Sequence, residues 1–394
     1  MSAPFRSHWG LDPEVRFLNH GSYGACPTAV LQKQAELRAR MEAEPVRFLH
    51  REIEPLYDAA RAALADFVGA DAEDVAFVTN ATSGVTTVLR SLRFAPGDEL
   101  LTTDHEYNAS RNALDFAAAT SGAKVVVATL PWPVTSEQAL VDAVLAHVTP
   151  RTRLLLVDHI SSQTALVMPV ARLVSELKAR GVETLVDGAH GPGQVPLSLR
   201  ELGAGYYTGN CHKWMCAPKG AAFLHVRRDL QPGLTPLAVS HGRNSPRTDR
   251  SRFRLEFDWT GTHDPTPALC VPDAIRVMGA MLPGGWPELR ASNRSKALAA
   301  RRLLCDRLGV APACPESMVG SMAVVGLPPG YPVQAEPPLY LDPLHLKLFE
   351  TYRIEVPIVP WPRAPQRHVR VSAQLYNTPD EYAALADALE ALLR

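Results

Sequence analysis

The sequence predicts an α/β protein with a large, mostly parallel seven-stranded sheet and a smaller α+β domain after it. The first observation behind this prediction is that seven short apolar runs alternate with helical patterns between about residues 70 and 230. Such alternation is typical of βαβ units, in which helices cover both faces of a parallel sheet. The second is that this rhythm stops near residue 265, where one long helical pattern and separate strands follow.

The elements are predicted in chain order from apolar spacing and turn residues. Residues 30–68 have apolar side chains at helical intervals and are predicted to be helical. Helices are also predicted between the strands, as at Leu140–His147 and at Val170–Arg180, which Gly181 ends in the usual way. The seven strands are predicted at Val75–Thr79, Glu99–Thr103, Lys124–Leu130, Arg153–Asp158, Glu183–Asp187, Gly205–Thr208 and Ala221–Val226.

The C-terminal part has its own pattern. Trp286–Leu308 reads as one long helix, and Thr378-Pro379-Asp380-Glu381 is a capping box that opens a last helix ending at Leu393. Strands are predicted at Ser321–Leu327, Ile354–Val359 and His368–Ser372. We therefore divide the chain into an N-terminal arm (1–25), a large domain (26–265) and a small C-terminal domain (266–394).

Composition excludes several classes of protein. The 40 basic and 41 acidic residues nearly cancel, so no basic field favours nucleic acid. No apolar run is long enough to span a membrane, and the first residues lack the apolar core of a signal peptide. The six cysteines are scattered without a CxxC pair, which predicts reduced thiols in a cytoplasmic protein. The histidines lack the spacing of metal ligands, so no metal is expected.

Two segments carry the chemistry. Val186-Asp187-Gly188-Ala189-His190 ends a predicted buried strand with an acid, and Tyr206–Trp214 ends the next strand with a polar turn that contains Lys213. Open α/β sheets place ligand groups at such strand ends. One acid and one lysine at adjacent strand ends suit pyridoxal phosphate (PLP), because the lysine can form a Schiff base and the acid can keep the pyridine nitrogen protonated. The alternative is a surface lysine and a helix-capping aspartate.

Other polar segments follow predicted strands or lie in turns. Asn80–Gly84 lies between a strand and a helix, where backbone N–H groups and hydroxyls bind anions, although an ordinary N-cap fits as well. Asp104–Asn108 offers an aromatic ring for stacking, and Asp158–Gln163 offers hydroxyl and amide groups; either is alternatively a plain turn. Asp258–Thr262 suits a phosphate contact or a turn. Arg370 suits a substrate carboxylate or is a surface residue.

Taken in this order, the motifs resemble those of the class V aminotransferase family of fold-type-I PLP enzymes, and within it the isopenicillin N epimerase branch. The resemblance runs from residue 17 to the C-terminal helix. Its elements are Phe17–Pro27, Asn80–Gly84, Thr103–Asn108, Asp187–His190, Thr208–Trp214 with Lys219-Gly220, Asp258–Thr262, Arg370 and Tyr376-Asn377-Thr378.

The resemblance implies a role for each matched residue. Lys213 would be the Schiff-base lysine and Asp187 the partner of the pyridine nitrogen. Arg370, with Asn19, would bind the substrate, and Thr262 would reach the phosphate of a second subunit, which implies a homodimer with shared active sites. Either Tyr107 or His105 would stack on the ring, since the local alignment can slip by two residues. The other implied cofactor ligands are Thr82, Ser83, Ser162, His190, Asn210 and His212.

The implied function is a PLP-dependent enzyme that acts at Cα of an amino acid or an amino-acid-derived substrate through an external aldimine, as an isopenicillin N epimerase does. A C–S lyase acting on a cysteine conjugate and a class V aminotransferase are the alternatives, and a non-enzymatic PLP-fold binding protein is disfavoured by the intact Lys213 and Asp187. Desulfurases of the family carry a nucleophilic cysteine shortly before the carboxylate-binding arginine. Residues 352–370 contain none, which counts against persulfide formation.

Overall fold

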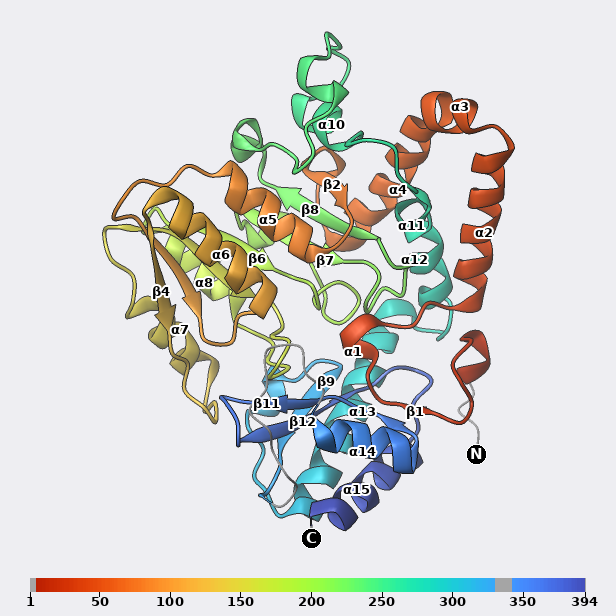
Figure 1. Ribbon diagram of the computed structural model, residues 1–394, viewed down its shortest axis with the longest axis vertical. Helices are drawn as coiled ribbons and strands as arrows, with labels where there is room; N and C mark the ends of the chain where they lie inside the picture. Colours follow the sequence, from red (N-terminus) through yellow and green to blue (C-terminus); the bar gives the residue numbers. More distant parts are fainter. Residues whose placement is uncertain (1–4, 330–341, 394) are drawn as a thin grey trace.

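The computed structural model describes residues 5–329 and 342–393, and its centre is a seven-stranded sheet (Figure 1). The strand order is β2-β8-β7-β6-β5-β3-β4, and only β8 runs antiparallel to its neighbours. The predicted strands are confirmed to within two residues at each end. Their bounds are β2 Val75–Val78, β3 Glu99–Thr103, β4 Lys124–Ala128, β5 Thr152–Asp158, β6 Glu183–Asp187, β7 Tyr206–Asn210 and β8 Ala222–Val226.

Helices cover both faces of this sheet, as the alternating pattern predicted. Along β5, Leu155 and Val157 join one core and Leu154 and Leu156 the other, because successive side chains of a strand point to opposite faces. The first core packs against α4 (Ile53–Val68), α7 (Glu137–Leu145), α8 (Val170–Lys178), α11 (Thr266–Leu269) and α12 (Val271–Gly279). The second packs against α5 (Ala81–Ser91), α6 (Asn108–Ser121) and α10 (Arg252–Phe257).

The predicted helix over residues 30–68 is interrupted. Helix α2 (Thr28–Ala43) ends before Glu44, whose extended backbone suits a residue that precedes a proline. The chain restarts as α3 (Pro45–Arg47), continues through a π-helical turn over Phe48–Glu52 and then becomes α4. The prediction of helix was therefore right for most of these residues and wrong about continuity.

The second unit contains the predicted C-terminal elements. The long helix α13 (Gly285–Leu308) and the final helix α15 (Pro379–Leu393) pack on a sheet of order β11-β12-β9. Its strands and remaining helix are β9 (Met322–Gly326), β11 (Ile358–Pro360), β12 (Arg367–Ser372) and α14 (Pro343–Tyr352). One of the two hydrogen bonds of the capping box is formed: the backbone N–H of Thr378 donates to the Glu381 carboxylate at 3.0 Å.

One predicted strand, Ile354–Val359, is in fact two. β10 (Ile354–Glu355) pairs in parallel with β1 (Arg16–Phe17), while β11 pairs with β12. The break falls at Pro357, which has no N–H to donate to a sheet. The N-terminal arm is thereby attached to the second unit, and the short helix α1 (His20–Tyr23) lies between the two units in Figure 1.

The assignment of residues 1–25, 26–265 and 266–394 to an arm and two domains stays a prediction. The core of the large sheet includes Ala268, Val271 and Ala274 of helices α11 and α12. The core of the second unit includes α13 from Ala297 onward and Leu18 of the arm. Among the described residues, no helix combines the length and the apolar character that crossing a membrane would need.

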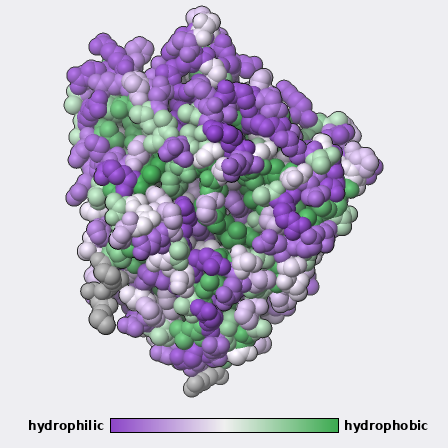
Figure 2. Space-filling model, turned by 180° about the vertical axis from the view of Figure 1, so that it is seen from behind, coloured by the Kyte–Doolittle hydropathy of each residue, from purple (hydrophilic) through white to green (hydrophobic). Residues whose placement is uncertain are grey.

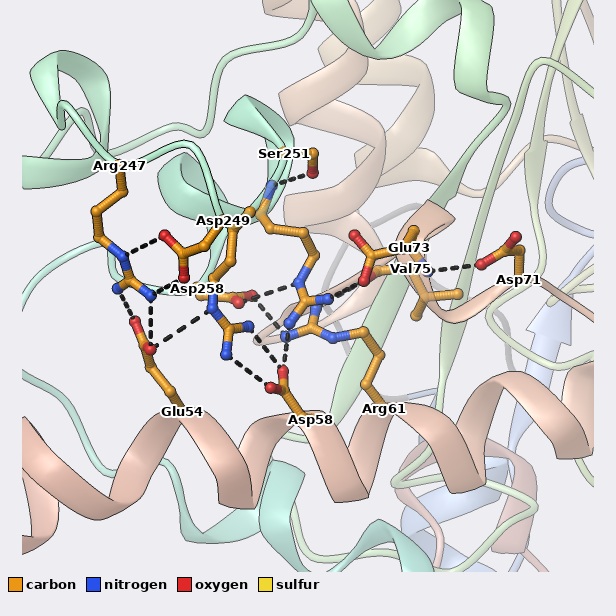
Figure 3. Close-up of polar contacts among 12 residues, drawn as sticks. Glu54, Asp58, Arg61, Asp71, Glu73, Val75, Arg247, Asp249, Ser251 and Asp258 are labelled. Atoms are coloured by element: carbon orange, nitrogen blue, oxygen red, sulfur yellow. Dashed lines mark hydrogen bonds and ion pairs between the residues drawn. The ribbon is translucent and has the colours of Figure 1, made fainter.

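A network of ion pairs fastens residues 247–258 onto helix α4 (Figure 3). Arg254 lies at its centre and contacts Asp58, Glu73 (2.6 Å) and Asp258 (3.1 Å). Arg61, whose side chain is buried, also contacts Asp258, at 2.6 Å. The two pairs with Asp258 are largely buried, and removing one partner of a buried ion pair is strongly destabilising, so they fix the position from which the segment 258–262 departs.

Candidate active site

Acidic and amide side chains converge where the strands of the large sheet end. Asp158, Asp187 and Asn210 are the last residues of β5, β6 and β7. The parallel register pairs Asp158 with Asp187, and Asp187 with Thr208. The chain leaves β7 in a turn that carries Lys213 over the same edge. The sequence therefore places acid and lysine together because adjacent parallel strands end at one edge.

Lys213 is held by the turn that follows Asp187. Its amine lies 3.0 Å from Nε2 of His190, and Nδ1 of His190 accepts a hydrogen bond from the indole N–H of Trp214 at 3.2 Å. Burial lowers the pKa of Lys213 to about 8, with the positive charge of Arg370 acting in the same direction. A larger share of the amine is consequently neutral and nucleophilic near neutral pH than for an exposed lysine.

Asp187 is a buried carboxylate with two hydrogen-bond donors. The Ser110 hydroxyl donates to Oδ2 at 2.6 Å and the backbone N–H of Ala189 to Oδ1 at 3.0 Å. Burial nevertheless raises the pKa of Asp187 above its usual value, because the hydrogen bonds only partly offset the loss of water. A cation beside this carboxylate would stabilise its charged form.

Two more acids lie beside Asp187. Oxygen atoms of Glu106, Asp158 and Asp187 are all within 4.8 Å of one another, and all three residues are buried. Burial, with the charge of neighbouring acids, raises the pKa of Glu106 and of Asp158 well above the usual range. Both oxygens of Glu106 lack a hydrogen-bond partner among the described residues. The pocket thus favours a bound cation or protonated carboxyls.

The N-terminus of α5 lies at the same edge. Asn80 caps it by accepting from the backbone N–H of Ser83 at 2.8 Å, so the cap is Asn80 rather than one of the hydroxyl residues. Asn210 accepts from the N–H of Ala81 at 2.8 Å and so joins β7 to this helix. Thr82 and Ser83 lie in the first turn, where the N–H groups of Ala81 and Ser83 are already paired, so the helix end would attract an anion through the Thr82 N–H, the two hydroxyls and the helix dipole.

His212 lies beside Lys213 and is partly buried. Its Nδ1 contacts the carbonyl of Ala221 at 2.8 Å and must therefore carry a hydrogen. Burial lowers the pKa of His212 to about 4, so Nε2 is unprotonated at neutral pH unless an anion lies beside it.

The two candidates for ring stacking lie in different surroundings. Tyr107 precedes α6, and 40% of its surface is exposed, so a ligand can reach its ring. His105 is buried, contacts the Thr164 hydroxyl at 2.7 Å through Nδ1, and packs edge-on against Trp361 at 4.4 Å between ring centres. The accessible ring of Tyr107 favours it as the stacking residue, which stays a prediction.

Arg370 reaches the segment after β5 from the second unit. Val369 and Val371 of β12 pack in the core of that unit, so the alternate residue Arg370 points the other way. Its guanidinium donates to the Ser162 carbonyl at 2.6 Å and to the Ser22 hydroxyl at 2.7 Å. Burial lowers its pKa to about 10, which leaves it charged at neutral pH.

One nitrogen of this guanidinium has no protein partner. Nε of Arg370 is buried and makes no hydrogen bond among the described residues. Asn19 lies next to the guanidinium: its Oδ1 accepts from Ser22 at 2.6 Å and its Nδ2 donates to Glu355 at 3.0 Å. Nε is therefore the guanidinium nitrogen that no protein group uses.

Thr262 lies on an exposed turn after α10. It lines a cavity of about 380 Å³ together with Thr79, Ser83 and Leu237. It also borders a second cavity of about 940 Å³, between the start of α4 and the segment 241–262. The described residues thus bring Thr262 and Ser83 to one hollow on the surface side of α5.

Several residues that shape the site were missed by the sequence reasoning. Ser110 lies three residues after Tyr107, one helical turn away, and only its place at the start of a predicted helix hinted at the Asp187 contact. Trp214 and Glu106 stood inside the quoted motifs, but a motif does not say which way a side chain points. Ser22 also stood inside a quoted motif, Phe17–Pro27, but nothing local indicated its contact with Arg370, which is 348 residues away.

Comparison with known proteins places this chain in a family. The model of the family "Aminotransferase class-V" matches residues 18–255, which is more than half of the chain. The chain belongs to the class V aminotransferase family. Members of this family use pyridoxal phosphate, so the expected cofactor and the expectation of an enzyme are confirmed.

The similar proteins include two kinds of enzyme. Isopenicillin N epimerase of Amycolatopsis lactamdurans is 38% identical, over 98% of this chain and 97% of that protein. A chloroplastic protein of Arabidopsis thaliana described as a probable L-cysteine desulfhydrase is 31% identical, over 97% of this chain and 84% of its own. A solved structure of a cystine C–S lyase with cysteine persulfide shares the fold, with a TM-score of 0.80 and 21% identity over 97% of this chain and 99% of that one.

The residues present fit the cofactor. A pyridinium is the cation that the buried Asp187 and its acidic neighbours favour. Lys213 supplies an amine that is partly neutral near pH 8. The first turn of α5, with Thr82 and Ser83, suits a phosphate. Ser162, His190, Asn210 and His212 lie around the same strand ends, and their roles toward the cofactor remain predictions.

Proposed function

We propose that this enzyme removes the Cα proton of an amino-acid substrate, with Lys213 as the base. The observation that carries the proposal is the position of the Lys213 amine, in contact with His190 and in the electrostatic neighbourhood of Asp187 and Arg370. Bound PLP supplies an electron sink for the negative charge left at Cα. A base with a pKa near the working pH transfers protons efficiently, and burial gives Lys213 such a pKa, about 8.

The other residues would orient the cofactor and the substrate and stabilise their charges. Asp187, ionised beside a cation, would hold a proton on the pyridine nitrogen, and Ser110 keeps its carboxylate in place through a 2.6 Å hydrogen bond. Arg370 would bind the substrate carboxylate through its unpaired Nε, with Asn19 and Ser22 fixing the guanidinium plane. Tyr107 would stack on the ring from the exposed side.

Epimerisation is the outcome that we favour, because the isopenicillin N epimerase is more similar over the whole chain than the desulfhydrase. β-Elimination from a cysteine conjugate is the second candidate, supported by the desulfhydrase and by the fold of the C–S lyase. Both begin with loss of the Cα proton. Residues 352–370, all described, contain no cysteine, which argues against a desulfurase-type persulfide.

One experiment tests the base and separates the outcomes. The purified enzyme with PLP is incubated in D₂O with L- and D-amino acids, peptides that carry a free α-amino acid group, and cysteine conjugates. Deuterium at Cα of both enantiomers indicates epimerisation, pyruvate with a released thiol indicates a lyase, and a keto acid that needs an acceptor indicates transamination. If no substrate exchanges its Cα proton in the wild type while PLP is bound, the proposal is wrong.

We further propose a homodimer in which the turn containing Thr262 contributes to the neighbouring subunit's phosphate site. Support comes from the hollow that contains Ser83 and Thr262 and from the adjoining cavity of about 940 Å³. Val46 and Leu237, which line these hollows, and the neighbouring Val239 are 49–62% exposed. On the face in Figure 2, hydrophobic patches are broken up by hydrophilic residues. Light scattering that finds a monomer with full PLP occupancy would overturn this proposal.

The protein is also proposed to be cytoplasmic. Its six cysteines are all free, and five of them are buried. Reduced thiols of this kind are typical of a reducing compartment. Fractionation of the native cells, with the enzyme followed by antibody, tests the location directly.

A further inference from the structure

Three side chains in series connect the core of the protein to the Lys213 amine. The indole N–H of Trp214 donates to Nδ1 of His190 at 3.2 Å, and Nε2 of the same ring lies 3.0 Å from Nζ of Lys213. Both His190 and Trp214 are at most 2% exposed, so water does not compete for these groups. The three groups can therefore pair only with one another, and the direction of hydrogen-bond donation between them can be worked out.

The direction follows from what each group can do. An indole nitrogen can only donate, so Nδ1 of His190 has to be the accepting nitrogen. Burial, together with the positive charges of Lys213 and Arg370, lowers the pKa of His190 well below its usual value and keeps the ring neutral. A neutral imidazole with an accepting Nδ1 carries its hydrogen on Nε2. That N–H points at Lys213 and needs a lone pair there, which only the neutral amine offers.

We propose that Trp214 is a positioning residue that locks His190 in its Nε2–H form and thereby favours the neutral amine of Lys213. The inference rests on the proposed role of Lys213 as the base. An ammonium at Lys213 would instead have to donate to Nε2, which requires the hydrogen on Nδ1, where the indole N–H already lies. The two hydrogens would then face each other, so protonation of Lys213 breaks one bond of the series.

The surrounding packing keeps the series from rearranging. The Trp214 ring packs against His20 at 4.9 Å between ring centres, and the His190 carbonyl accepts from Gln194 at 3.1 Å. Rotation of either ring would leave a buried polar group without a partner, which is costly.

The charges around Lys213 act beside this contact. Arg370 lowers the pKa of its amine, and Asp187 and Asp158 raise it. His20, which contacts the Lys213 carbonyl at 3.1 Å, has its own pKa lowered to about 3 by burial and is neutral. The indole contact also favours the neutral Lys213 amine, but it does so by fixing the tautomer of His190 and not through a charge.

The first test reads the tautomer in the wild-type full-length chain. The protein is labelled with ¹⁵N-histidine, freed of cofactor, and the two ring nitrogens of His190 are identified by their loss in His190→Gln. We expect Nδ1 to resonate as an unprotonated nitrogen and Nε2 as a protonated one between pH 6 and 9. The opposite assignment, or a ring that exchanges between both forms, would refute the proposal without any change at Trp214.

The second test measures the pKa of Lys213 in the same cofactor-free protein, where its amine is not tied up in a Schiff base, by competitive labelling with trace acetic anhydride across pH, followed by peptide mass spectrometry with Lys33 as the internal reference. Trp214→Phe keeps a flat ring but removes the N–H. The Lys213 pKa should rise by about one pH unit, the worth of one exchanged hydrogen bond. The control is Trp286→Phe, which removes a 3.0 Å indole bond to the Ile275 carbonyl and should leave this pKa unchanged.

The outcomes separate this inference from the proposed function. An unaltered Lys213 pKa in Trp214→Phe refutes the lock, even if the variant still binds PLP and exchanges Cα protons. Absence of Cα exchange in the wild type refutes the function, whatever the tautomer. If Trp214→Phe fails to fold, as judged by circular dichroism, the wild-type ¹⁵N experiment decides alone.

Discussion

Replacing Arg370 with lysine should weaken substrate binding because lysine lacks the unpaired Nε of this side chain. Arg370 is 4% exposed and donates to Ser162 through Nη1 and to Ser22 through Nη2, while its buried Nε atom has no partner among the described residues. A substrate carboxylate that replaces the Ser22 contact can therefore take Nε and Nη2 as a pair. Lysine has a single nitrogen on a flexible stem and cannot offer two parallel donors.

The magnitude follows from the bond that is lost. A hydrogen bond to a charged group contributes about 1.5–3 kcal/mol, so losing one member of the pair should raise Kd by roughly 10- to 150-fold, at about 1.4 kcal/mol per factor of ten. Turnover should fall as well. A carboxylate held by one hydrogen bond can rotate, and the Cα–H bond then tilts away from the perpendicular to the cofactor ring. Binding of PLP itself should not change.

The assay compares Kd for a non-reactive substrate analogue and for its carboxamide, in wild type and in Arg370→Lys. The wild type should prefer the carboxylate by the factor above, and the variant should lose most of that preference. Arg294→Lys is the control, because Arg294, on α13, donates to the backbone carbonyls of Val319 and Glu316 and contacts none of the proposed site residues. A full carboxylate preference in Arg370→Lys would show that the anchor lies elsewhere.

Four further predictions follow from the site. Lys213→Ala should lose the absorbance near 400–430 nm, roughly the range of a lysine-bound cofactor, and borohydride mapping that labels another lysine would contradict it. Asp187→Asn should still bind PLP but exchange the Cα proton orders of magnitude more slowly; unchanged exchange would refute the role. PLP incorporation should speed up about tenfold per pH unit below pH 8 and level off above it, because only the neutral Lys213 amine reacts; a rate independent of pH over that range would exclude the assigned pKa. Gly24→Ala, where a Cβ would lie 2.7 Å from the His212 carbonyl at φ +67°, should weaken PLP binding in a fluorescence titration, whereas Gly10→Ala, with nothing within 4 Å, should not.

Most of the fold could be predicted because its signals are local. Each strand of the large sheet is a short apolar run bounded by turn residues, and those runs are visible in the sequence. The breaks at Pro45 and Pro357 were also marked by proline, but apolar spacing on both sides favoured continuity. The antiparallel direction of β8 left no such mark, because a strand buried on both faces has the same composition in either direction.

The candidate site was predictable where residues stand at strand ends and not where they meet across the chain. Asp187 and Lys213 follow from two adjacent strands. The contact of Arg370 with Ser22 joins residues 348 positions apart, and that of Trp214 with His190 depends on rotamers in a packed interior. Neither is encoded by spacing, because tertiary packing decides the direction in which each side chain points.

The N-terminal arm shows why an irregular segment can be part of a catalytic motif. Leu18 packs in the core of the second unit, and its carbonyl accepts from Ser372 of β12, so the arm is attached to the strand that carries Arg370. A few residues later, His20 contacts the Lys213 carbonyl, and Gly24 lies so close to the lysine turn that a Cβ would meet its backbone. The arm therefore joins the proposed carboxylate anchor to the lysine turn across the crevice. Glycine at position 24 is required because that close approach leaves no room for a side chain.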